Sequence, residues 1–68
     1  MEEGDIYEHY KGNLYQIICV GRHSETLEAV VIYRALYGDF GVWVRPLNMF
    51  LEQVDLNGKS IARFKKVV

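Results

Sequence analysis

The run "VVIY" at residues 30–33 constrains the fold most, because three β-branched residues are followed directly by a tyrosine. Such side chains lose rotamer freedom in a helix and pack well on the pleated surface of a sheet. Gly and Asp in the next segment, "YGDFG", are typical of a loop between two paired strands. We therefore predict a strand over residues 27–36.

A helix is the competing interpretation of the same segment. Ser24 is a plausible N-cap, Glu25 and Glu28 suit a first helical turn, and Gly38 could end the helix. The sequence alone leaves both open, although the β-branched run favours the strand.

Turn residues divide the rest of the chain into further strands. Gly and Asn in "KGN" follow an alternating segment that begins at Ile6, and "DLNG" precedes the last apolar segment. Pro46 and the helical spacing of apolar residues in "PLNMFLEQV" predict a short helix or 3₁₀ turn. Further strands are expected at residues 14–21, 42–45 and about 60–64, with the tail "KKVV" expected to fray.

The register of the hairpin around "YGDFG" is not fixed by the sequence. One register places Tyr33 opposite Arg45, where a cation–π contact is available. The other places Arg34 opposite Arg45, which is destabilising unless a carboxylate or an anionic ligand lies between the two charges.

The chain length limits the architecture to a small one. With 68 residues, a chain buries only about 60% of the surface of its unfolded state. We expect a single domain over residues 1–68, with an ordered core at residues 4–64 and short flexible termini. Antiparallel strands with a helical turn before the last strand predict a mainly β fold, a small SH3-like, partly open barrel.

Composition and charge exclude several classes of protein. No apolar run approaches the roughly 18 residues of a membrane span, and the acidic start "MEEGD" lacks a signal-peptide core. Cys19 stands alone, so a reducing cytoplasm fits best. The formal net charge of −1 does not support nucleic-acid binding, although a local patch could still provide it.

Metal binding and catalysis find little support in the residue spacing. His9, His23, Glu25 and Cys19 lack the short fixed spacing of a zinc site, and His23 beside Ser24 is no nucleophile motif. The segment "RHSETLE" is better explained as a hydrogen-bonded loop. We expect no catalytic residue, no metal and no cofactor.

Aromatic residues and arginines are abundant for so small a barrel. Together they suit stacking and the binding of anions, and each could equally belong to the core or its rim. The candidate ligand-binding residues are Tyr7, His9, His23, Glu25, Arg34, Tyr37, Trp43 and Arg45.

The segments "YEHYKGNLYQI", "RHSETLEAVVIYRALYG" and "WVRPLNMFLEQV", with the later "ARF", resemble a family of small bacterial domains of unknown function numbered 1653. The resemblance extends over roughly residues 4–64. It implies a bacterial, cytoplasmic protein, and it implies no activity.

These observations together predict a non-catalytic binding module with a patch for an anionic or planar ligand. The alternatives are a small hydrolytic or metal-dependent enzyme using His9, His23 and Glu25, and a subunit whose patch contacts another protein.

Overall fold

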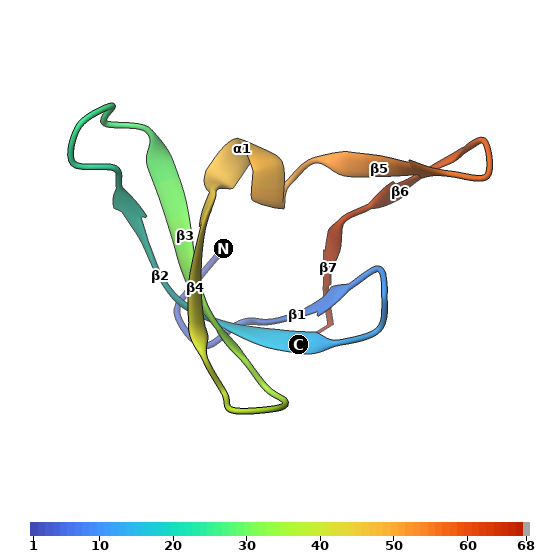
Figure 1. Ribbon diagram of the computed structural model, residues 1–68, viewed down its shortest axis with the longest axis horizontal. Helices are drawn as coiled ribbons and strands as arrows, with labels where there is room; N and C mark the ends of the chain where they lie inside the picture. Colours follow the sequence, from blue (N-terminus) through green and yellow to red (C-terminus); the bar gives the residue numbers. More distant parts are fainter. Residues whose placement is uncertain (68) are drawn as a thin grey trace.

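The computed structural model describes residues 1–67 and is mainly β, as predicted (Figure 1). A single helical turn lies between the fourth strand and the remaining ones. The elements in chain order are β1 (Ile6–His9), β2 (Leu14–Arg22), β3 (Ala29–Ala35), β4 (Val42–Pro46), α1 (Leu47–Phe50), β5 (Gln53–Leu56), β6 (Lys59–Ala62) and β7 (Phe64–Lys66).

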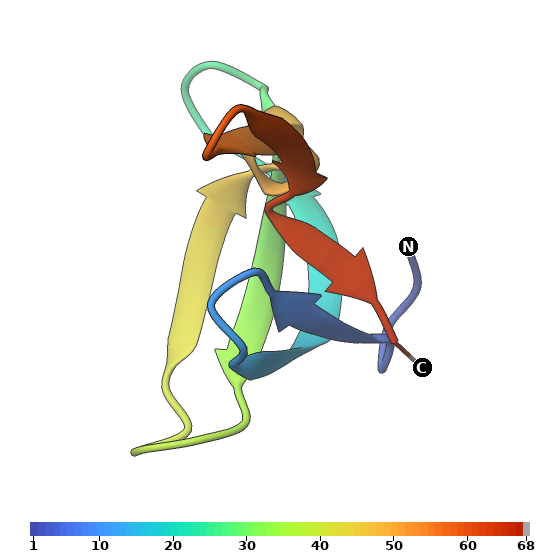
Figure 2. The same cartoon turned by 90° about the vertical axis from the view of Figure 1, so that its right-hand side faces the viewer.

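The main sheet is antiparallel and has the strand order β4-β3-β2-β1-β7, while β5 and β6 form a separate two-stranded sheet. β2, β3 and β4 run side by side, and β1 and β7 cross them obliquely (Figure 2). The long β2 pairs with both β1 and β3. Its register with β3 shifts between Ile17 and Cys19. The sheet therefore curls into a barrel that stays open between β4 and β7, which confirms the predicted fold class.

The contested segment is a strand, so the competing helix is wrong. β3 is shorter than predicted and begins only at Ala29. Before it, Leu27 has a left-handed φ of 63° and belongs to the loop, where its N–H donates to the His23 carbonyl over 2.9 Å. The loop therefore includes Leu27, which the sequence predicted to lie in the strand because it is apolar.

Neither predicted register of the β3–β4 hairpin is correct. Tyr33 lies opposite Trp43, and Arg45 lies opposite Val31 rather than opposite a tyrosine or a second arginine. The connection contains two residues with positive φ, Gly38 at 62° and Phe40 at 57°. The conformation of this loop sets which residues of β4 lie opposite β3.

The segment after α1 forms three strands, β5, β6 and β7, where the sequence predicted a single closing strand. Asn57 and Gly58, with φ of 54° and 79°, make the expected turn, but it joins β5 to β6. At Arg63 the backbone leaves this hairpin, since its N–H donates to the Glu52 carbonyl and its carbonyl accepts from the Tyr10 N–H. The chain then enters β7, which pairs with β1 in the segment where the sequence predicted fraying.

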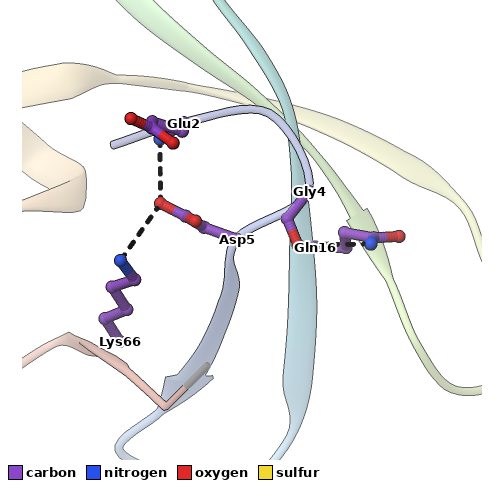
Figure 3. A network of polar contacts seen from close by, with 5 residues as sticks. All are labelled: Glu2, Gly4, Asp5, Gln16 and Lys66. Carbon is purple, nitrogen blue, oxygen red and sulfur yellow. Dashed lines mark hydrogen bonds and ion pairs between the residues drawn. The ribbon is translucent and has the colours of Figure 1, made fainter.

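The N-terminal residues are tied to the sheet by polar contacts (Figure 3). The Asp5 carboxylate accepts from the Glu2 N–H over 2.8 Å and lies 3.7 Å from the Lys66 ammonium. The Gln16 side-chain amide donates to the Gly4 carbonyl. These contacts hold the N-terminus against β2 and β7.

The core is mostly aromatic, with Phe50 and Phe64 at its centre. Their rings are stacked with centroids 4.0 Å apart and planes 3° from parallel, and Phe50 is fully buried. The rings of Tyr7 and Tyr33 meet Phe50 edge-on, at 5.3 Å and 5.4 Å. The buried cluster consists of Tyr7, Ile17, Val31, Tyr33, Phe50 and Phe64.

Replacing Phe50 with alanine should therefore destabilise the protein strongly. Removing a fully buried phenylalanine costs about 3–5 kcal/mol, which is comparable to the whole free energy of unfolding of a small domain. Leu51→Ala, next in the chain but 59% exposed, should change it by less than about 0.5 kcal/mol. Urea unfolding measures both variants, and similar losses for the two would contradict the central place of Phe50.

Candidate ligand-binding site

A pocket lined by four aromatic side chains and one arginine lies on the inner face of the sheet. Its volume is about 200 Å³, which is smaller than the volume of a second hollow described below. We call it the aromatic pocket. Its lining residues are Tyr15, Tyr33, Tyr37, Trp43 and Arg45.

Strand alternation explains why these residues meet. Trp43 and Arg45 are two apart on β4 and therefore share a face of the sheet, and Trp43 lies opposite Tyr33 on β3. Tyr15 precedes the buried Ile17 by two residues on β2, so it faces the same side. Three neighbouring strands thus supply one continuous aromatic surface.

Tyr37 joins the pocket from the loop that follows β3. Its hydroxyl lies 2.6 Å from the Tyr15 hydroxyl, and the two rings meet edge-on at 5.5 Å. Burial raises the pKa of Tyr15 to about 12, with the hydrogen bond to Tyr37 as the next cause. The Tyr15 hydroxyl is therefore a neutral polar group at physiological pH.

Arg45 supplies the positive charge of the pocket. Its Nε donates to the Tyr33 hydroxyl over 3.2 Å, and its guanidinium lies 5.7 Å from the centre of the Phe64 ring. Within residues 1–67 the ion pairs join other side chains, so Arg45 has no carboxylate partner there. Its terminal nitrogens suit a bidentate contact with an anion.

Trp43 is 59% exposed, although it is the largest apolar side chain of the pocket. A core tryptophan would be mostly buried, whereas this one borders open solvent beside the other rings. Its indole therefore offers an accessible surface for stacking.

His9, at the end of β1, lies near the pocket and lines a different hollow. Its ring is 6.5 Å from that of Tyr15 and 5.0 Å from that of Phe64, and its Nδ1 accepts the Lys11 N–H over 3.2 Å. Burial lowers the pKa of His9 from 6.5, and the charge of Arg45 lowers it further. The second hollow, of about 260 Å³, is lined by Glu8, His9, Tyr10, Ile61, Ala62 and Lys65.

The other candidate residues lie apart from the aromatic pocket. Tyr7 is buried in the core. Arg34 is on the opposite face of β3 from Tyr33 and donates to the Phe40 carbonyl over 3.0 Å. The structure therefore gathers Tyr37, Trp43 and Arg45 from the predicted set, but neither Tyr7 nor Arg34.

His23 and Glu25 lie in the loop between β2 and β3. The His23 Nδ1 accepts the backbone N–H of Glu25 over 3.1 Å, so the imidazole is bound to the backbone of its own loop. His9 precedes β2 and His23 follows it, at opposite ends of a nine-residue strand. His9, His23 and Glu25 therefore do not converge on one enzyme site, and residues 1–67 contain no group of three metal-ligating side chains.

Tyr15 and Tyr33 are pocket residues that the candidate set omits. The available signal is the alternation of "LYQI" in β2, which puts Tyr15 on the same face as Ile17. The sequence alone does not tell which face of a mostly apolar strand points to the pocket.

Comparison with known proteins identifies the family. The family model described as "Protein of unknown function (DUF1653)" matches residues 5–66. The chain belongs to the DUF1653 family. This confirms the resemblance noted in the sequence.

A crystal structure of a DUF1653 protein from Bordetella bronchiseptica is similar to this chain, with a TM-score of 0.85 and 36% identity. The match covers 98% of this chain and 87% of the other. No curated protein matches the chain. The described residues contain no helix with the length and apolar character needed to span a membrane.

The environment of His9 predicts a pH-dependent stability. The folded state disfavours the imidazolium, whereas the unfolded chain takes up the proton near the reference pKa of 6.5. Because the unfolded state then binds more protons, the free energy of unfolding should fall as the pH drops through 6.5, until the folded pKa is passed.

His9→Asn, whose side-chain oxygen can still accept the Lys11 N–H, should remove this part of the pH dependence. Urea unfolding between about pH 7 and 5 measures the effect, and NMR of the imidazole ring gives the pKa directly. A His9 pKa above 6.5, or an unchanged dependence in the variant, would contradict the explanation.

Proposed function

We propose that the protein is a single-domain, non-catalytic binding module whose aromatic pocket takes a planar ligand with an anionic substituent. The observation that carries the proposal is the meeting of an accessible Trp43 with Arg45, an arginine that has no carboxylate partner within residues 1–67. A flat ring would stack on the indole while its acidic group contacts the guanidinium.

The size of the pocket supports a small ligand. Sites for drug-sized molecules have volumes of about 300–1,000 Å³, whereas the aromatic pocket has about 200 Å³. One ring system fits this space, and the rest of a larger ligand would extend into solvent beside Trp43.

The charge in the pocket argues against a cationic ligand. Rings of tyrosine and tryptophan can enclose quaternary ammonium groups, but Arg45 lies among them and would repel a cation. An anion instead gains from the same guanidinium, whose Nε is already held by the Tyr33 hydroxyl.

We place this module in the cytoplasm of a bacterium. The Bordetella bronchiseptica relative supports a bacterial source. Cys19 is exposed and free, and an exposed thiol persists unpaired in a reducing compartment.

Titration with adenosine monophosphate and with adenosine tests the proposal, because the two probes share a planar base and differ in the anionic group. Hydrogen bonds to a charged group contribute about 1.5–3 kcal/mol, so the monophosphate should bind at least about tenfold more tightly. Tryptophan fluorescence and NMR shifts at Trp43 measure both affinities.

Matched variants assign the two halves of the site. Arg45→Met should abolish the preference for the monophosphate and leave adenosine binding unchanged, while Trp43→Ala should weaken both. Val44→Ser, on the opposite face of β4, is the control. Equal affinities for the two probes in the native protein, or shifts away from the pocket, would refute the proposal.

A further inference from the structure

The two edges of the main sheet differ in how they resist pairing with another chain. β7 carries Lys65 and Lys66, and charged lysines are a common means of protecting an edge strand. β4 at the other edge reads Val42, Trp43 and Val44 before its first charge, and these side chains are 48%, 59% and 62% exposed. An apolar, exposed edge of this kind is typical of a strand that pairs with a partner.

The hydrogen-bond pattern shows which groups of β4 are available. The Ala35 N–H donates to the Gly41 carbonyl over 2.9 Å, and Gly41 precedes Trp43 by two residues. Because bonding alternates along an antiparallel strand, Trp43 also faces β3, whereas Val42 and Val44 direct their N–H and C=O groups outward. β4 is the last strand of its sheet, on the left border in Figure 2, so no strand within residues 1–67 satisfies these four groups.

We propose that two copies of this chain associate through β4, antiparallel, about a two-fold axis at Trp43. Val42 of each copy then pairs with Val44 of the other, which satisfies all four outward groups with four hydrogen bonds. Trp43 meets Trp43 of the second copy in a close, non-hydrogen-bonded pair. Arg45 lies opposite Gly41, so no like charges face each other.

The register of this pairing follows from the residues at the end of β4. Moving the axis to Val44 would place Val42 opposite Pro46, which has no N–H to donate. Moving it to Val42 would place Val44 opposite Phe40, whose φ of 57° is not that of a strand. The edge is therefore self-complementary in one register, which is why a second copy fits it better than an unrelated strand.

The association rests on the free edge and not on the proposed ligand. It leaves both faces of the sheet open and brings Trp43 of the second copy beside the aromatic pocket. The contact is small for a protein interface, so we expect a weak dimer, with a Kd on the order of 10–100 μM.

Sedimentation equilibrium up to about 1 mM, well above this Kd, measures the mass, which should rise from 7.9 kDa toward twice that value. Amide NMR shifts over the same dilution series should be largest at Val42, Trp43 and Val44. A chain that stays monomeric overturns the proposal. So does a dimer whose shifts lie at β7 or at the β5–β6 hairpin.

Val44→Pro removes an N–H that points away from β3, and by symmetry it deletes two of the four hydrogen bonds. We expect at least a tenfold rise in Kd, whereas Val44→Thr, which keeps the N–H and the branched side chain, should stay within about twofold. Val44→Lys is a second variant that keeps the backbone, and circular dichroism checks folding. Unchanged association of folded Val44→Lys and Val44→Pro proteins would also overturn the proposal.

Discussion

The stacking of Phe50 on Phe64 is the contact on which the rest of the structure depends. α1 is a single turn and β7 has three residues, and segments this short have little stability of their own. Each supplies one ring to the stack, so each holds the other against the sheet. The tyrosines of β1 and β3 then pack edge-on around this pair.

The aromatic pocket is built directly on that core. Phe64 contacts Phe50 on one side, while Arg45, His9 and Tyr15 lie around its ring. Arg45 and Tyr15 are thus positioned against buried rings, whereas Tyr37 comes from the loop that follows β3. This arrangement fixes the charge of Arg45 beside Trp43, so the ligand that we propose would have little ordering to impose.

The sequence predicted the elements well and their mutual positions poorly. β-branched residues identified β3, and Asn57 with Gly58 identified a turn, because both signals are local. The β3–β4 register depends on the left-handed Phe40, a conformation that its residue type does not suggest. The side of β2 that carries Tyr15 is set by the curl of the sheet, and the polar loop at His23 satisfies its own backbone. Tertiary structure therefore decided which candidate residues meet.

The β5–β6 hairpin extends away from the barrel (Figure 1) and pairs with none of the other strands of residues 1–67. The chain enters it after Phe50 and leaves it before Phe64, and the Glu52–Arg63 ion pair of 3.0 Å joins its two ends. Its amide protons should therefore exchange with solvent through local opening, far faster than those of β2 and β3. Insertions or deletions in the β5–β6 hairpin should leave the barrel intact, because both ends of the hairpin stay fixed to the core.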